Sequence, residues 1–315
     1  MKKKMLLLLI VLSVLLTACS GKENKTENNG KLQVVTSFYP VYLLAQTVTE
    51  GAEGMELWNM AQPQTGCLHD YELTISDMKM LEGADVLIIN GGGMEGFLEQ
   101  ALERYPELII VDTSAGIELL EESHHHHDEE TEAEQDAHAD HAHEGNPHIW
   151  LSPEKAAHQA ETIAAALGKL DAEDAGIFAA NAENFHEAAH SLQEKARHIG
   201  IPEGECAAVF HEGFAYLAEL FHMENVFGIF ADDYEMPSAR ELAEAADEAK
   251  RHGIRFFLTA ADGGQIYAET IAAEGDETVI ILDPLTTADE AGLSYLERME
   301  KNIEMVEKYW KEGTE

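Results

Sequence analysis

The chain has 315 residues, of which 60 are acidic and 20 are basic, so its formal net charge is −40. A field of that sign repels nucleic acid and anionic lipid headgroups and attracts cations, so nucleic acid is not an expected partner. Three cysteines are too few for a disulfide scaffold, and the length is large for one core but suits two lobes.

The first thirty residues have the pattern of an export signal and a tether. Three lysines precede an apolar run that begins at Met5, and small residues lead to Cys19. The run is too short to span a bilayer comfortably, and its end fits a bacterial lipobox. We expect residues 1–19 to be a lipoprotein signal peptide with Cys19 acylated, and residues 20–31 to be a flexible tether. A plain signal peptide with an incidental cysteine is the alternative.

Short apolar runs alternate with helical periodicities along the rest of the chain. Continuous apolar strands separated by helices favour parallel sheets covered on both faces. We therefore predict an α/β protein of two lobes, each with a parallel β-sheet flanked by helices. The expected strands are "LQVVTS", "MELWNM", "ADVLIIN" and "LIIVD", then "CAAVF", "NVFGIF", "RFFLTA" and "TVIILD". The expected helices include "YPVYLLAQTV", "GFAYLAELF" and helices that begin near Ile75, Met94, Ser238, Gln265 and Ala288.

One long helix is predicted between the two halves. Phenylalanine, leucine and isoleucine recur every seven residues from Phe178 to Ile199, and Asp171 is the candidate N-cap. Just before it, Ser152 and Pro153 fit the N-cap and first position of a shorter helix. The predicted domains are an N-terminal lobe (32–170) that includes a His- and acid-rich loop (121–146), a linking helix (171–199) and a C-terminal lobe (200–315).

Four candidate metal ligands follow predicted strands. In open α/β sheets, ligands bind beyond the carboxyl ends of the strands, and two candidates come from each lobe. Three imidazoles and one carboxylate suit four-coordinate Zn²⁺, with Mn²⁺ as the alternative. The candidates are His69, His148, His211 and Asp283.

Several segments carry a family resemblance that runs from about Leu32 to Trp310. They are "VVTSFYPVYLLAQTV", "HDYELTISDM", "ADVLIINGGGMEGF", "NPHIWLSP", "FHEGFAYLA", "LDPL" and "GLSYLERMEKN". The chain resembles the zinc/manganese-binding lipoproteins of bacterial ABC importers, the cluster A-I solute-binding proteins. The resemblance implies two α/β lobes, a rigid linking helix and a metal held between the lobes.

The same resemblance assigns the ligands residue by residue. His69 and His148 match the first two ligand histidines, and His211 matches the third position, where zinc binders carry histidine and many manganese binders carry glutamate. Asp283 matches the position where a carboxylate can complete the coordination sphere. The chain departs from the family pattern in "GCLHDYEL", which lacks a proline before His69, at Thr259-Ala260, where an acidic residue is common, and in "YEMPS". These departures concern details of the cleft and the metal geometry.

The loop before His148 is rich in histidine and acid and contains no Lys or Arg. A purification tag would normally be terminal, and a solvated insertion without a role is the plain alternative. Several imidazoles on a mobile tether can bind Zn²⁺ weakly and raise its concentration near the site, as in zinc-type members of the resembled family. The predicted auxiliary ligands are His124, His125, His126, His127, His138, His141 and His143.

Two motifs imitate enzymes. "NGGGMEG" satisfies the glycine spacing of a dinucleotide-binding loop, but it comes late in its lobe, and a tight strand–helix turn explains the glycines. "HEGFA" begins like a zinc-protease motif, but Ala215 stands where the second histidine is needed. Glu212 could still act as a base, so a zinc hydrolase is the alternative from another class. A catalytic zinc keeps one position open, whereas Asp283 would close a transport site.

Cys67 and Cys206, the two cysteines that follow Cys19, have both structural and functional interpretations. Cys67 stands two residues before His69, so thiolate ligation is an alternative to the nitrogen and oxygen set. Export would permit a Cys67–Cys206 disulfide, although Cys206 begins the strand that His211 follows. Two free thiols are the default expectation.

We interpret the chain as an extracytoplasmic, lipid-anchored Zn²⁺ receptor that serves the permease and ATPase of an ABC importer. It is expected to be a monomer and not an enzyme. A Mn²⁺ receptor, a zinc hydrolase, and a surface metal store or adhesin are the other hypotheses. Because imidazoles must be neutral to bind metal, affinity should weaken below about pH 6.

Overall fold

The computed structural model describes residues 30–61, 68, 71–121, 145–228, 238–261, 263–289 and 291–313. The chain divides into two units, Met1–Lys31 and Leu32–Glu315, and both lobes belong to the second. The predicted signal peptide, Cys19 and nearly all of the tether lie outside the described residues. Over those residues, none of the helices combines the length and apolar character that crossing a membrane requires.

The N-terminal lobe contains a parallel sheet of four strands in the order β2-β1-β3-β4. The strands are β1 (Leu32–Thr36), β2 (Met55–Asn59), β3 (Val86–Ile89) and β4 (Ile109–Asp112). The central strands β1 and β3 carry the continuous apolar runs that a doubly covered sheet requires, and Val34, Val86 and Ile88 are fully buried. All four predicted strands of this half are confirmed.

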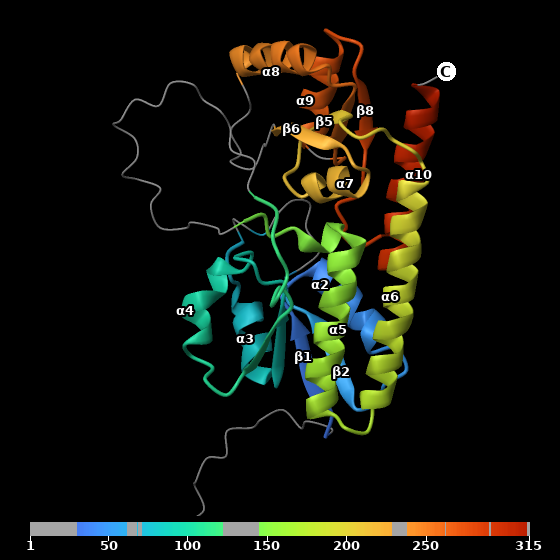
Figure 1. The fold of residues 1–315 in the computed structure, drawn as a ribbon. Helices are drawn as coiled ribbons and strands as arrows, with labels where there is room; N and C mark the ends of the chain where they lie inside the picture. The colour runs from blue at the N-terminus through green and yellow to red at the C-terminus, as the bar shows by residue number, and fades with distance from the viewer. Residues whose placement is uncertain are drawn as a thin grey trace, which may run out of the picture. The chain divides into compact units, whose positions relative to one another are not determined.

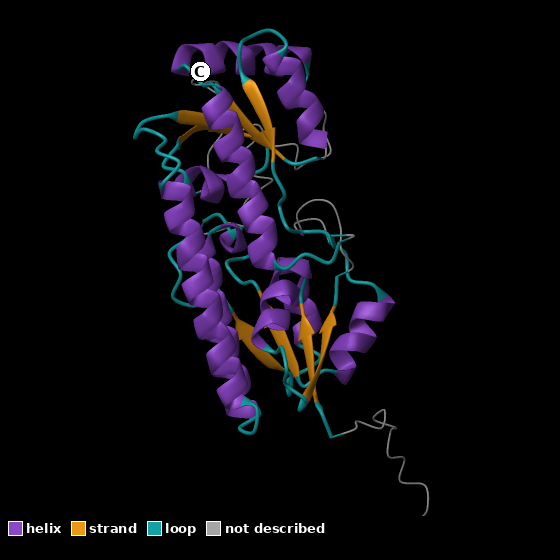
Figure 2. Ribbon diagram, turned by 90° about the vertical axis from the view of Figure 1, so that its right-hand side faces the viewer, coloured by secondary structure: helices purple, strands orange, loops and turns teal. Residues whose placement is uncertain are grey.

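The C-terminal lobe repeats this topology, with a parallel sheet in the order β6-β5-β7-β8. The strands are β5 (Cys206–Val209), β6 (Glu224–Gly228), β7 (Phe256–Thr259) and β8 (Thr278–Ile281). Both views show the N-terminal sheet beside the lower half of the longest helix in the described residues, and the C-terminal sheet beyond its upper end (Figures 1 and 2). The fold class predicted from the sequence is therefore confirmed.

Helices flank both sheets, and side chains at their first turns explain where several of them begin. Thr74, Ser238 and Ser294 each form a capping box with an acidic residue three positions later. Ser152 caps its helix and Pro153 follows it, as predicted. The helices are α2 (Tyr39–Val48), α3 (Ile75–Gly83), α4 (Glu99–Leu102), α5 (Pro153–Leu170), α7 (Phe214–Leu220), α8 (Ala239–His252), α9 (Gly263–Ala272) and α10 (Tyr295–Glu312).

The long linking helix is α6 (Ala175–Arg197), which has 23 residues and is therefore about 35 Å long. It runs beside α5 and α10 from one lobe to the other (Figure 1). The predicted N-cap, Asp171, lies too early, because its carboxylate accepts hydrogen bonds from the backbone of Glu173 and Asp174 in the turn before the helix. Asp174 is the N-cap instead.

Two other helix starts differ from the prediction. The last helix begins at Tyr295 rather than near Ala288, because Gly292 takes a φ of +70° and closes a turn with Asp289 before the capping box of Ser294. The helix expected near Met94 begins as a 3₁₀ turn (Gly96–Leu98), and its α-helical part is only four residues long. In both places local turn bonds prevail over the apolar periodicity.

One hydrophobic cluster passes through both lobes and includes residues from Val34 in β1 to Trp310 in α10. Trp150, which is fully buried, lies where the lobes meet. Its indole N–H donates to the carbonyl of Pro284 at 2.9 Å, and its own carbonyl accepts from the Tyr295 hydroxyl at 2.7 Å. The two lobes therefore share a core.

Candidate metal centre

His148 lies at the N-terminal side of the lobe junction and is completely buried. The segment Asn146-Pro147-His148 precedes a 3₁₀ turn (Ile149–Leu151) that leads into α5. The ring Nδ1 of His148 lies 2.8 Å from Oδ1 of Asn146, and its backbone N–H donates to the same oxygen at 3.0 Å. The ring is thus held by a residue only two positions away.

His211 lies at the C-terminal side of the junction, just beyond the carboxyl end of β5, and only 4% of it is exposed. The backbone N–H of Gly213 donates to its Nδ1 at 3.1 Å. The ring also packs against Phe214 in the first turn of α7, with 5.2 Å between centroids. The placement of His211 beyond a strand end agrees with the sequence prediction.

The structure brings these two histidines together from different lobes. Their ring centroids are 5.0 Å apart and their planes are inclined by 79°. Two imidazoles that bind one tetrahedral zinc ion through nitrogens at about 2.0 Å have centroids about 5 Å apart. The pair therefore has the spacing that a shared zinc ion requires.

The structure describes only some of the other predicted ligands. His69, Cys67 and the seven auxiliary histidines lie outside the described residues. Among the residues that are described, no group of three His, Cys, Asp or Glu side chains could hold a metal ion, so Asp283 does not join the histidine pair in such a group. Cys206 is a free, partly buried thiol, and burial raises its pKa.

Asp283 lies just beyond β8, where the sequence placed it, and it is bound to Arg298 of α10. The guanidinium donates to Oδ1 and to Oδ2, both at 2.6 Å, and the backbone N–H of Leu285 donates to Oδ1 at 2.8 Å. A ligating carboxylate is usually hydrogen-bonded to outer partners as well, so this arrangement suits a ligand but also suits a structural ion pair.

The glycine-rich turn after β3 binds a carboxylate of the protein itself. Gly91, Gly92 and Gly93 all have positive φ values, a conformation that glycine adopts without steric cost. The backbone N–H groups of Asn90 and Gly91 donate to Glu95 at 2.7 and 3.0 Å, and the Ser37 hydroxyl donates to it at 2.7 Å. The amides that a dinucleotide phosphate would need are occupied by Glu95, so the glycines serve a tight turn.

Glu95 gives a pH-dependent contribution to stability. Burial raises its pKa from 4.5 to about 7, although three donors oppose that shift. The folded state then binds the proton more tightly than the unfolded state, so the free energy of unfolding falls as pH rises from 4.5 to about 7. The expected loss is about 3 kcal/mol, measured by urea unfolding of metal-free protein against Glu95→Gln. Parallel pH curves for the two proteins would refute this, and Glu99→Gln, at an exposed site, is the control.

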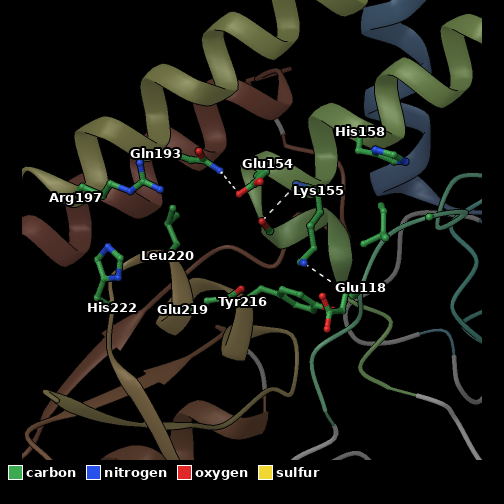
Figure 3. Close-up of a pocket in the computed structure, with 13 residues that line it drawn as sticks. Glu118, Glu154, Lys155, His158, Gln193, Arg197, Tyr216, Glu219, Leu220 and His222 are labelled. Carbon is green, nitrogen blue, oxygen red and sulfur yellow. Dashed lines mark hydrogen bonds between the residues drawn. The ribbon is translucent and has the colours of Figure 1, made fainter. Parts of the chain in front are cut away.

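A separate cavity of about 490 Å³ lies at the junction between α5, α6 and α7 (Figure 3). Lys155 lines it, donates to the Glu118 carbonyl at 2.9 Å and lies 5.7 Å from the centroid of the Tyr216 ring. None of the three described ligand candidates, His148, His211 and Asp283, lines this cavity. The histidine pair is therefore not part of it.

Gly213 allows the close approach of the two histidine segments. A Cβ atom at this position would lie 2.8 Å from Leu151 Cδ1 and 3.0 Å from two atoms of His148. The backbone of Gly213 is ordinary helical, with a φ of −58°, so the contact alone requires glycine. The sequence analysis did not identify Gly213, Asn146 or Arg298 as functional residues, and the only signal was their presence in the quoted segments.

The variant Gly213→Ala is expected to separate the two histidine segments. Forcing a methyl group into a packed site costs about 1–3 kcal/mol, so we expect a loss of metal affinity of about tenfold or more. The measurement is a zinc titration of the metal-free protein. Gly176→Ala in α6 is the matched control, because its added Cβ meets nothing within 4 Å, and unchanged affinity in Gly213→Ala would contradict the prediction.

Fold and site define a two-lobed α/β binding protein in which each lobe contributes a buried histidine to one junction. The chain belongs to the ZnuA family, described as zinc-uptake complex component A, periplasmic, whose pattern matches residues 34–309. It is 29% identical over 312 residues to the zinc-binding lipoprotein AdcA of Streptococcus pneumoniae (strain ATCC BAA-255 / R6), covering 96% of this chain and 60% of that protein.

Two further comparisons cover nearly the full length of the relative. The high-affinity zinc uptake system protein ZnuA of Bacillus subtilis (strain 168) is 27% identical over 303 residues, which is 92% of each chain. The Ni²⁺-bound SBP FpvC of P. aeruginosa superposes with a TM-score of 0.74 at 22% identity, over 90% of this chain and 98% of that one. The second likeness concerns the fold alone.

Proposed function

We propose that this chain is an extracytoplasmic receptor that binds Zn²⁺ and delivers it to an ABC importer. The observation that carries the proposal is the buried pair His148 and His211, which come from different lobes and lie 5.0 Å apart between centroids. His69 is proposed as the third nitrogen ligand. Asp283, which forms no metal-holding group with the histidine pair in the described structure, is proposed as the oxygen ligand that would join them when the metal binds. Membership in the ZnuA family and the zinc-binding relatives support the same metal.

The ligand type favours zinc over manganese. Imidazole nitrogens suit Zn²⁺, whereas Mn²⁺ prefers carboxylate, carbonyl and water oxygens. His211 supplies a nitrogen at a position where a carboxylate would shift the set towards oxygen. Mn²⁺ is therefore the competitor against which the proposal is tested.

Burial of both histidines supports a carrier site rather than a catalytic one. A catalytic zinc needs an open coordination position for water and substrate. His148 and His211 are almost inaccessible to solvent, and we propose that the protein captures its metal without chemical conversion. Loading and release would then depend on small movements of the lobes.

Partners and location follow from the family and from the first residues of the chain. The family description names a component of a zinc-uptake complex, and we propose a membrane permease and an ATPase as the other components. Acylation of Cys19 would anchor the monomeric receptor at the outer face of the cell membrane. The histidines of the loop 121–146 would collect zinc near the site.

The test is a competition titration of metal-free mature protein with Zn²⁺ against Mn²⁺, read as stoichiometry and affinity. We expect one tight zinc equivalent and further weak equivalents. A variant with all seven auxiliary histidines replaced by serine should lose only the weak equivalents. Preference for Mn²⁺ would replace the proposal by the manganese receptor, and a single equivalent in both proteins would remove the collecting role of the loop.

A further inference from the structure

Asn146 contacts both lobes through its side chain. Its backbone N–H donates to the Leu120 carbonyl at 2.8 Å, so these two residues form an antiparallel bridge at the base of the loop between them. Its side-chain Nδ2 donates to the Glu212 carbonyl in the C-terminal lobe at 3.0 Å. Its Oδ1 faces the backbone and the ring of His148 in the N-terminal lobe.

These partners determine the orientation of the Asn146 amide. Nδ2 must face the Glu212 carbonyl, because a carbonyl oxygen only accepts hydrogen bonds. Oδ1 must therefore face the backbone N–H of His148, which only donates. An amide oxygen cannot donate to the ring, so Nδ1 of His148 carries the proton, and the lone pair of the neutral ring is on Nε2.

His211 has the opposite tautomer. The backbone N–H of Gly213 donates to its Nδ1, so that nitrogen holds the lone pair and Nε2 carries the proton in the neutral ring. His148 is thus arranged to bind a metal through Nε2, whereas His211 must exchange its Nδ1 contact before it can bind in the same way. The two rings provide an internal comparison within one protein.

Tyr216 of α7 supports the same segment from the C-terminal lobe. Its hydroxyl donates to the Asn146 carbonyl at 2.7 Å and accepts from the Leu120 N–H at 3.1 Å. The ring is fully buried, and burial raises the pKa of the hydroxyl to about 12, so it stays a donor at neutral pH. One hydroxyl from the C-terminal lobe therefore contacts both residues at the base of the loop.

We infer that Asn146 is a positioning residue that sets the tautomer of His148 for metal binding and joins it to the backbone beside His211. This inference rests on the proposed zinc-binding function, which it deepens. Metal-ligating histidines usually donate their second ring N–H to an outer partner, and loss of that partner typically lowers metal affinity 10- to 100-fold. An asparagine that also bonds to the opposite lobe couples ligand orientation to the relative position of the lobes.

The experiment compares Asn146→Ala and Asn146→Asp with the wild type in two measurements. The first is imidazole-nitrogen NMR of the metal-free full mature chain, with the His148 signals assigned from a His148→Gln sample. The wild type should show protonated Nδ1 at His148 and protonated Nε2 at His211. Asn146→Ala should shift His148 to a mixture and leave His211 unchanged, whereas Asn146→Asp, which keeps the acceptor, should preserve the His148 tautomer.

The second measurement is zinc affinity. Asn146→Ala should bind zinc about 10- to 100-fold more weakly than the wild type, and Asn146→Asp should recover most of that loss. Asn181→Ala is the matched control, because this α6 asparagine also donates to two backbone carbonyls, of Val48 and Glu50, remote in sequence from the site. It should change neither measurement.

The outcomes separate the inference from the proposed function. A wild-type spectrum with protonated Nε2 at His148 overturns the inference, whether or not the variants fold. An unchanged tautomer in Asn146→Ala, or zinc affinity within about threefold of wild type, also overturns it. If the wild type shows the expected tautomers but binds no zinc, the proposed function fails by itself.

Discussion

Zinc affinity should fall by more than about 100-fold when His211 is replaced by alanine, and by as much when His148 is replaced. Each ring supplies a nitrogen from a different lobe, and loss of a ligand should exceed the largest effect typical of an outer partner. The measurement is a titration of metal-free protein against a competing chelator. Because neither histidine is needed for strand pairing, the far-ultraviolet circular dichroism should stay unchanged.

The matched control is His190→Ala, which removes an exposed histidine from α6. Its affinity should equal that of the wild type. If His211→Ala kept its affinity within about threefold, the strong site would lie elsewhere, and the auxiliary histidines would be the next candidates. If His148→Ala kept its zinc affinity and His211→Ala lost it, the strong site would be confined to the C-terminal lobe.

Replacing Arg298 with methionine should lower the free energy of unfolding by about 3 kcal/mol. The guanidinium is nearly inaccessible, donates twice to Asp283 and also donates to the Thr287 carbonyl at 2.8 Å. Removing it leaves a carboxylate whose side chain is only 35% exposed, and water can compensate that charge in part. The expected loss is therefore at the lower end of the range for broken buried pairs.

Urea unfolding of the metal-free variants measures this loss. Arg197→Met is the control, since its ion pair with Glu194 is exposed and should contribute less than about 1 kcal/mol. The double variant Arg298→Met/Asp283→Asn should regain part of the stability, because it removes the uncompensated charge. Equal stability of the Arg298 and Arg197 variants would contradict the prediction.

Much of the fold could be predicted because its signals are local. Strands such as "ADVLIIN" are continuous apolar runs, and the heptad spacing of Phe178, Phe185 and Leu192 marks the buried side of α6. Helix starts were less predictable. The observed N-caps are Asp174 and Ser294. Nearby polar residues are equally plausible N-caps from the sequence, and hydrogen bonds in the preceding turns decide between them.

The site was predictable as a set of residue types but not as a set of contacts. Histidines beyond strand ends indicate metal ligands, and the two described ones do meet. The bonds around the candidate ligands join separate elements: Asn146 reaches Glu212 of the other lobe, and Arg298 of α10 reaches Asp283 beyond β8. Periodicity and spacing contain no information on such pairs, because the tertiary fold creates them.

The continuous hydrophobic cluster from Val34 to Trp310 has a consequence for how the protein unfolds. Domains with separate cores can melt in separate steps, whereas residues that share one core lose their packing together. The two lobes should therefore unfold in a single calorimetric transition. If the chain is cleaved between the lobes, neither fragment should unfold cooperatively by itself. A smaller cluster, which includes Ala245 and Ala249 of α8 and Ile271 of α9, is separate from the main core. Its amides should exchange with solvent before those of the rest.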